Sequence, residues 1–201
     1  EVANAAPPPP EKATEVALDD RPTAPAGSGP TTVVDGVAMG YRPDAEGAEA
    51  AAREFVRATA SMVAMEPALA LAAQRVMTAS AVEESLVTKR SAELQNIWGS
   101  AGRDGLSYWF TPVASRAEVI GDGEAIAEVW YVGVLRSSLV PGQQVWRTAT
   151  YALVWEDDDW RVSEESEVVG PVPMLGLGQT PTSTAAEMDS LLAGFDSGPT
   201  P

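Results

Sequence analysis

The chain has 201 residues, of which 13 are Lys or Arg and 29 are Asp or Glu, and it contains neither cysteine nor histidine. A formal charge of −16 argues against nucleic acid as a partner and against a polybasic contact with anionic lipid, because both need a basic surface. Without cysteine and histidine the chain can form no disulfide, no thiolate zinc site and no Ser-His-Asp triad. We therefore expect no cofactor and no metal.

The first 35 residues are rich in proline and small residues, with a tetraproline run at Pro7–Pro10. Proline favours extended backbone, and the small side chains between the prolines bury little surface, so residues 1–35 are predicted to be a disordered linker. The chain starts at Glu1 and not at Met, and we expect a segment upstream of Glu1 to tether it to the cell membrane. The predicted location is extracytoplasmic, with the cytoplasm as the alternative.

Helical signals follow the linker. Asp44 precedes an alanine-rich stretch whose apolar residues recur every three or four positions, which predicts a helix capped by Asp44. Pro67 is expected to begin a second helix, since proline suits the first helical turn. Ser80, with Glu83 three residues later, predicts a capping box at the start of a third helix, which Gly99 should end.

Beyond residue 105 the spacing of the apolar residues changes. They no longer recur every three or four positions, as in a helix, but at every second position, as in a strand. The turn signal Gly121-Asp122-Gly123 and the acidic run at 156–159 separate segments of alternating polar and apolar residues. Strands are predicted over 106–112, 113–120, 125–136, 145–156 and 160–169.

Together these elements predict an α+β fold in which three N-terminal helices pack on a strongly curved antiparallel sheet, with disordered N- and C-terminal tails. The domain is expected to span residues 36–175. Residues 176–201 are expected to form a flexible tail with a short amphipathic helix at about 184–192.

The closing segment Val154–Val162 reads Val-Trp-Glu-Asp-Asp-Asp-Trp-Arg-Val. An aromatic strand end, an acidic turn and Trp-Arg-Val resemble the last hairpin of nuclear-transport-factor-2-like (NTF2-like) domains, the superfold of SnoaL and ketosteroid isomerase. With the order of the elements, the resemblance covers about Tyr41 to Val169. It implies a cone formed by the sheet and closed by the helices.

A second resemblance concerns Gly36–Tyr41 and Gly47–Ala52. These segments are similar to membrane-tethered proteins of actinobacterial mobile elements and conjugation loci, which are themselves similar to TcpC and to assembly factors of type IV secretion systems. This resemblance implies a non-enzymatic, extracytoplasmic module for protein–protein interaction and assembly, with other envelope or secretion-machine proteins as partners. A homo-oligomer is an alternative, and membrane contact is expected only through a segment upstream of Glu1. The candidate partner surface comprises three tryptophans, Trp146, Trp155 and Trp160.

The alternative function is a binder of a small apolar ligand, or an isomerase-like enzyme, that uses the cone. Isomerase-type members of the superfold use a carboxylate base and a tyrosine donor in the cone, and Glu118 or Glu128 with Tyr108, Tyr131 or Tyr151 are the candidates here. For Glu128 we also weigh a pairing with Arg116, Arg136 or Arg147 across the strands. The candidate cone-lining residues are Phe55, Met62, Trp98, Tyr108, Glu128 and Tyr131.

Overall fold

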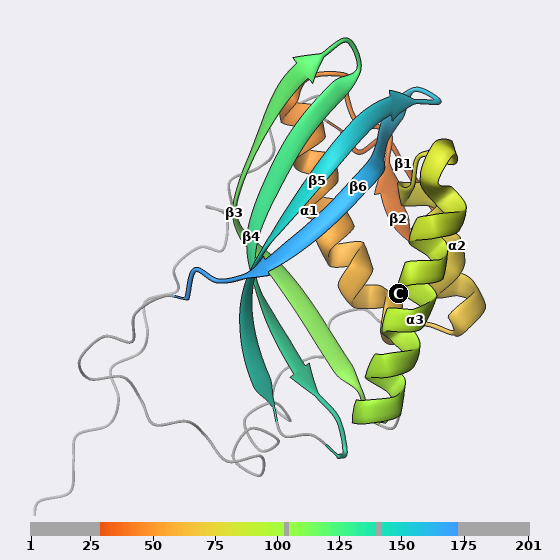
Figure 1. The fold of residues 1–201 in the computed structure, drawn as a ribbon, viewed down its shortest axis with the longest axis vertical. Coiled ribbons are helices and arrows are strands. Elements are labelled where there is room, and N and C mark those ends of the chain that lie inside the picture. The colour runs from red at the N-terminus through yellow and green to blue at the C-terminus, as the bar shows by residue number, and fades with distance from the viewer. Residues whose placement is uncertain (1–28, 103–104, 140–141, 173–201) are drawn as a thin grey trace, which may run out of the picture.

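The computed structural model describes residues 29–102, 105–139 and 142–172, and within them the chain forms an α+β fold (Figure 1). Its helices are α1 (Ala45–Met62), α2 (Pro67–Met77) and α3 (Glu83–Ala101), with a 3-10 turn, η1 (Ser80–Val82), before α3. Its strands are β1 (Thr32–Val34), β2 (Val37–Met39), β3 (Ser107–Gly121), β4 (Glu124–Arg136), β5 (Gln143–Glu156) and β6 (Asp159–Val169).

The strands form two separate antiparallel sheets. β1 and β2 make a two-stranded hairpin, and β3 to β6 make a four-stranded sheet in the order β3-β4-β5-β6. The hairpin turns at Asp35 and Gly36, whose positive φ angles of 48° and 82° suit the two-residue turns that match strand twist. Figure 1 shows the four long strands strongly twisted, with the helices on one side of them.

The predicted fold class, three N-terminal helices on a single curved sheet forming an NTF2-like cone, is therefore wrong. A second sheet is present, and its strands β1 and β2 precede the helices. β1 also lies within residues 1–35, which were predicted to form the linker. Three-residue strands are too short to show an alternating pattern, although Asp35-Gly36 is a recognisable hairpin signal. Residues 1–28 of the predicted linker and the predicted tail at 176–201, with its helix at 184–192, lie outside the described residues.

The predicted helix starts are confirmed for α1 and α2 but not for α3. The Asp44 carboxylate accepts a hydrogen bond from the Gly47 N–H at 2.8 Å, and Pro67 occupies the first turn of α2. The capping box is wrong, because the 3-10 turn occupies Ser80–Val82 and α3 begins only at Glu83, without a side-chain cap. α3 also continues past Gly99 to Ala101.

One face of the four-stranded sheet, the inner face, packs against α1. Small residues line both sides of this contact, so the helix can approach the strands closely. Phe55 of α1 meets Tyr151 of β5 edge to face, with ring centroids 6.2 Å apart. The buried small residues of the contact are Ala48, Ala51, Ala52, Ala125, Ala127 and Ala149.

Two bulges change which residues point to the inner face. In β3 the register shifts between Pro112 and Ala114, and in β6 the extra residue is Ser163. Side chains alternate between faces along a strand, so each bulge reverses the alternation beyond it. In β6, Glu165 and Glu167 consequently lie opposite the inward residues Tyr151 and Ala149. The β6 bulge therefore brings two carboxylates to the inner face.

A buried carboxylate joins the start of β6 to the segment that leads into α1. Asp159, with 4% of its surface exposed, accepts hydrogen bonds from the N–H groups of Gly40 at 2.5 Å and Tyr41 at 3.2 Å. It also accepts one from the N–H of Trp160 at 2.9 Å, and the Trp160 indole donates to the carbonyl of Arg42 at 2.7 Å. These contacts fix the hairpin and α1 relative to the four-stranded sheet.

The substitution Asp159→Ala should lower the free energy of unfolding by about 3 kcal/mol, because it leaves buried N–H donors without an acceptor. Urea unfolding followed by circular dichroism measures the change. Asp159→Asn, which keeps one acceptor oxygen, should have an intermediate effect. The exposed carboxylate of Glu118 provides the control, and Glu118→Ala should change stability by no more than about 0.5 kcal/mol. Equal stability of Asp159→Ala and Glu118→Ala would show that the anchor is not needed.

Candidate functional site

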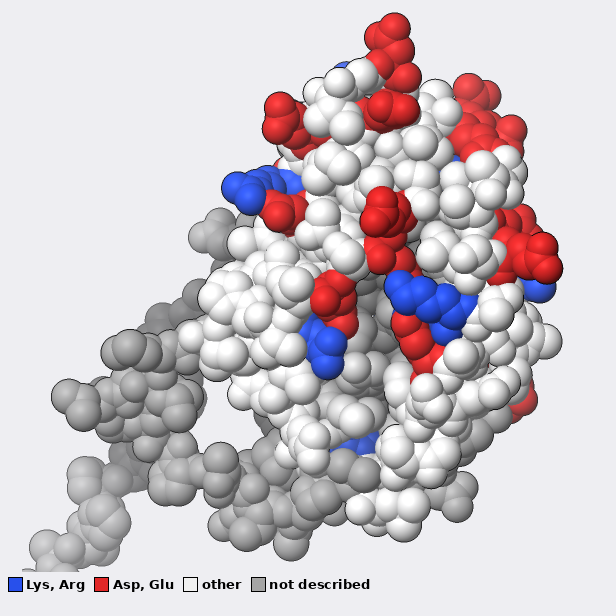
Figure 2. All heavy atoms as spheres, in the orientation of Figure 1, with Lys and Arg blue, Asp and Glu red and all other residues white. Residues whose placement is uncertain are grey.

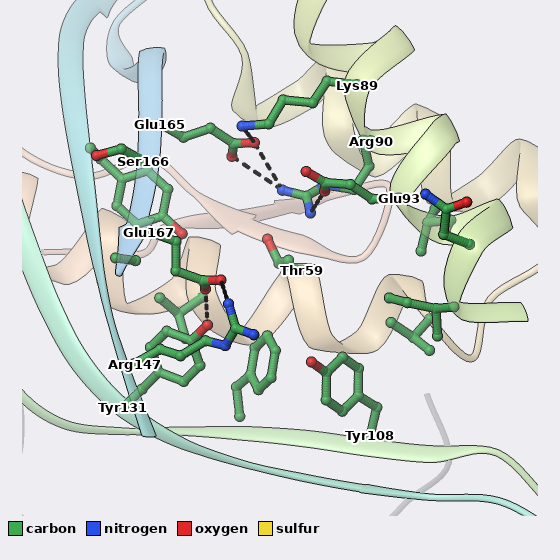
Figure 3. A pocket seen from close by; sticks show the side chains of 18 residues that line it. Thr59, Lys89, Arg90, Glu93, Tyr108, Tyr131, Arg147, Glu165, Ser166 and Glu167 are labelled. Carbon is green, nitrogen blue, oxygen red and sulfur yellow. Dashed lines mark hydrogen bonds and ion pairs between the residues drawn. The ribbon is translucent and has the colours of Figure 1, made fainter. Parts of the chain in front are cut away.

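A cavity of about 420 Å³ lies between α1, α3 and the inner face of the four-stranded sheet. Figure 2 shows a hollow on this side of the molecule, with acidic and basic side chains gathered at its rim. The close-up in Figure 3 shows the side chains that line it. Its apolar wall is formed by Val56, Val63, Leu94, Ile97, Phe110 and Ala149.

At one side of the cavity, α3 and β6 are joined by ion pairs around Arg90. The guanidinium contacts both oxygens of Glu165, at 3.1 and 3.2 Å, and donates to Glu93 at 2.6 Å. Its Nε donates to the side-chain oxygen of Gln74 at 2.9 Å, and Lys89 reaches Glu165 at 3.1 Å. The side chains of Arg90 and Glu165 are 12% and 11% exposed, so this central pair is largely buried and its charges are compensated, whereas Lys89 and Glu93 lie at its exposed edge.

A second polar group lies on β4, β5 and β6. The Tyr131 hydroxyl donates to one oxygen of Glu167, and Arg147 donates to the other at 2.5 Å. In Figure 3 this group lies below the Arg90 cluster, with Thr59 of α1 between the two. Burial and the hydrogen bond with Glu167 raise the pKa of Tyr131 far above its ordinary value. Tyr131 is therefore a neutral donor near neutral pH.

Two further tyrosines line the cavity without a hydrogen-bond partner among the described residues. Tyr108 extends from β3 with its hydroxyl pointing into the cavity, as Figure 3 shows, and Tyr151 lies on β5. Burial raises the pKa of both, and the nearby charge of Glu165 contributes to the rise for Tyr151. In the described part of the chain, every fully enclosed side-chain N or O atom has a partner. The two hydroxyls consequently open onto the free space of the cavity.

Of the six residues predicted to line the cone, only Tyr108 and Tyr131 line this cavity. Phe55 and Met62 are fully buried in the core, and the Trp98 indole donates to the Val63 carbonyl at 2.9 Å. The cavity is thus not filled by these side chains, which leaves ligand binding open. The sixth residue, Glu128, lies outside it.

Glu128 projects from the opposite face of the sheet, the outer face. There it pairs across the strands with Arg116, as the alternative interpretation held. Glu118 has the same orientation, because its partner in β4 is the outward residue Ile126. Neither carboxylate can serve a reaction in the cavity. The carboxylates that do line the cavity, Glu93, Glu165 and Glu167, are each ion-paired.

Sequence patterns did not place Arg90, Glu165 or Glu167 in a site. Arg147 was expected only as a possible partner of Glu128, and Tyr151 only as one of three tyrosine candidates. The two glutamates face inward only because of the β6 bulge, for which the sequence has no strong signal. Arg90 and Glu165 are 75 positions apart and meet only through the packing of α3 beside β6. Their opposite charges are visible in the sequence, but their proximity is not.

The outer face carries a cluster of aromatic and aliphatic residues that no described helix covers. Trp130 and Trp146 stack with ring centroids 5.0 Å apart, and the Trp130 indole donates to the Pro171 carbonyl at 2.9 Å. At its edges Trp109 is 51% and Val168 is 62% exposed. We call this cluster the tryptophan face, and it comprises Trp109, Trp130, Val132, Val134, Trp146 and Val168.

Of the predicted partner surface, only Trp146 belongs to the tryptophan face. Trp160 is 1% exposed and is a core residue, which excludes it from a surface. Trp155 packs against it edge to face, with ring centroids 5.3 Å apart. The register of β5 and β6 explains why Trp155 and Trp160 both point inward. The two residues lie opposite each other, on the same face of the sheet as the buried pair Leu153 and Val162.

The acidic run at the β5–β6 turn has a structural role. Glu156 accepts hydrogen bonds from the Ser80 N–H at 3.1 and 3.3 Å, and hydrogen bonds from Ser80 hold the pKa of Glu156 below its ordinary value. Asp157 and Asp158 form the turn with positive φ angles. Within the described ranges, no group of three or more Asp or Glu residues is placed to hold a metal ion.

The fold and site define an α+β domain with a ligand-sized cavity on one face of its main sheet and an exposed aromatic cluster on the other. Residues 2–184 match the family described as "Domain of unknown function (DUF8175)", and the chain belongs to this family. No curated protein matches the chain. In the part of the chain that the structure describes, no helix combines the length and apolar character needed to cross a membrane.

Two solved structures are similar to the chain at low sequence identity. One is the intermembrane space region of the chloroplast protein ARC6, with 17% identity and a TM-score of 0.44, over 63% of this chain and 98% of that chain. The other is a putative calcium/calmodulin-dependent protein kinase II association domain from Xanthomonas campestris, with 12% identity and a TM-score of 0.40, over 57% of this chain and 79% of that one. At these scores neither likeness defines the function of this chain. The resemblances to NTF2-like and TcpC-like proteins stay predictions.

All four tyrosines of the chain should resist ionisation while it is folded, because burial raises the pKa of Tyr41, Tyr108, Tyr131 and Tyr151. A raised pKa means that the unfolded state loses these protons first. The stability due to the neutral tyrosines is therefore fully present below pH about 10 and falls as the pH rises above it. In an alkaline titration, tyrosinate absorbance and loss of helical circular dichroism should appear together.

The same titration in concentrated guanidinium chloride is the control, and there the tyrosines should ionise near pH about 10. Ionisation of any tyrosine near that pH with unchanged circular dichroism would contradict the buried arrangement.

Proposed function

We propose that the domain is a non-enzymatic module for protein–protein interaction and assembly, and that its contact surface is the tryptophan face. The observation that supports this proposal most directly is the exposure of Trp109 and Val168 beside the stacked pair Trp130–Trp146. Clustered aromatic residues on an otherwise polar surface are typical of protein interfaces, where tryptophan often contributes most of the binding energy. A non-enzymatic role is supported by the ion pairing of every carboxylate that lines the cavity.

The partner we propose is a protein with an apolar surface patch and a basic rim. The chain has a formal charge of −16, and the acidic residues Glu118, Glu124 and Glu164 are exposed on the outer face beyond the tryptophan face. A basic rim on the partner would complement these charges and increase the rate of association. The resemblance to proteins of conjugation loci supports an envelope or DNA-transfer machine as the assembly in which such a partner occurs.

Site-specific photocrosslinking in the native cells tests this interaction. A photoreactive amino acid at position 109 or 168 should crosslink to a defined protein, whereas the same amino acid at position 69 should not. Leu69 is a matched control because it is 59% exposed and lies on α2, away from the tryptophan face.

The crosslinked protein is then purified and titrated against the full chain. The double variant Trp109→Ser/Val168→Ser should weaken binding by about tenfold or more, and Leu69→Ser by less than about twofold. Added salt should slow association, as expected for complementary charges. Equal crosslinking at position 69, absence of crosslinks at 109 and 168, or unchanged affinity of the double variant would each overturn the proposal.

We also propose that the domain lies outside the cell membrane. The proline-rich composition of residues 1–35 and the resemblance to membrane-tethered proteins support this location. A protease added to intact cells after removal of the wall should degrade the protein and leave a cytoplasmic marker intact. Protection of both proteins until the membrane is lysed would contradict this location and favour the cytoplasm.

A further inference from the structure

The cavity on the inner face is not used by the interaction proposed for the outer face, and its chemistry points to a ligand. Its volume of about 420 Å³ is within the range of small-molecule sites, which is roughly 300–1,000 Å³. Nine of the 18 residues that line it are aliphatic or aromatic, and water against this part of the wall gains few hydrogen bonds from it. An apolar group placed there would displace this water favourably.

The hydroxyls of Tyr108 and Tyr151 supply the polar part of the site. Neither has a hydrogen-bond partner among the described residues, and both open onto the cavity. Burial keeps both hydroxyls protonated near neutral pH, so each can donate a hydrogen bond. The Tyr131 hydroxyl is already engaged with Glu167. The two free donors match one or two acceptor oxygens on a ligand.

The charges around the cavity favour a neutral ligand. Three basic and three acidic side chains line it, and each basic side chain is paired with a glutamate. An anionic ligand could bind Arg90 or Arg147 only by displacing Glu165 or Glu167, which would leave a partly buried carboxylate unpaired. A cationic ligand could bind Glu165 or Glu167 only by displacing Arg90 or Arg147, which would leave a partly buried guanidinium unpaired.

We propose that this cavity binds a small, neutral molecule that has an apolar part and carries a carbonyl or similar acceptor oxygen, with Tyr108 and Tyr151 donating hydrogen bonds to it. The apolar part of the molecule lies against the wall formed by Val56, Leu94 and Phe110. Recognition is of this chemical class and does not depend on the partner of the tryptophan face.

Three naphthalene probes of similar size test the assignment with the full chain. They are 2-acetylnaphthalene, which has an acceptor oxygen, 2-isopropenylnaphthalene, in which a CH2 group replaces that oxygen, and 2-naphthoate, which is an anion. Binding is measured by ligand-observed NMR. The ketone should bind about fivefold or more tightly than the isopropenyl compound, as expected for one hydrogen bond of about 1 kcal/mol, and more tightly than the naphthoate.

Variants locate the binding in the cavity. Tyr151→Phe and Tyr108→Phe remove only the hydroxyls, and at least one of them should reduce the advantage of the ketone over the isopropenyl compound to less than about twofold. Tyr41→Phe is the matched control, because Tyr41 is a buried tyrosine that does not line the cavity, and it should leave that advantage unchanged. Ala149→Leu should fill the cavity and abolish binding of all three probes. If that variant fails to fold, Thr59→Leu replaces it from the α1 side.

Four results would overturn the inference. They are absence of binding by any probe, tightest binding by the naphthoate, an unchanged ketone advantage in both phenylalanine variants, and binding that survives in a folded cavity-filling variant. Each can be distinguished from failure of the protein interaction, since that interaction is measured with variants on the outer face.

Discussion

The arrangement of this domain depends on the buried carboxylate of Asp159. Its side chain accepts hydrogen bonds from Gly40, Tyr41 and Trp160, and so connects the segment before α1 to a strand more than 100 positions later in the chain. Trp160 strengthens the same connection through the Arg42 carbonyl. A charged group at 4% exposure is tolerated because backbone donors surround it. This connection holds the segment that leads into α1 against the start of β6.

Much of the main sheet and two of the helix starts could be predicted from the sequence. Asp44 and Pro67 act through the backbone of their own neighbourhood, and such local signals can be read directly. The second sheet was missed because β1 and β2 have three residues each, too few for a period to be recognised. The capping box failed because Ser80 begins a 3-10 turn, and its N–H donates to Glu156 on the distant β5. A tertiary contact thus replaced the local cap.

The site was less predictable than the fold because its residues are assembled by two bulges. In β4, which has no bulge of its own, alternation alone places Tyr131 inward and Glu128 outward. In β6 the same rule applied from Val162 would place Glu164 and Ser166 on the inner face and would leave Glu165 and Glu167 outside. Because of the extra residue Ser163, Glu165 and Glu167 face inward and Glu164 and Ser166 face outward. A strand pattern read without the bulge therefore misses the carboxylates that pair with Arg90 and Arg147.

The two faces of the sheet draw their residues from adjacent positions of the same strands. Trp146 faces outward and Arg147 inward on β5, and on β6 Val168 and Glu167 are divided in the same way. A one-residue change of register would therefore move charges onto the tryptophan face and apolar groups into the ion pairs. The ion pair between Arg147 and Glu167 opposes such a change on the inner face, and the hydrogen bond from Thr148 to the Gly170 carbonyl at 2.9 Å opposes it at the strand end. The paired charges of the cavity thus have a structural consequence beyond the cavity, because they keep Trp146 of β5 on the opposite face.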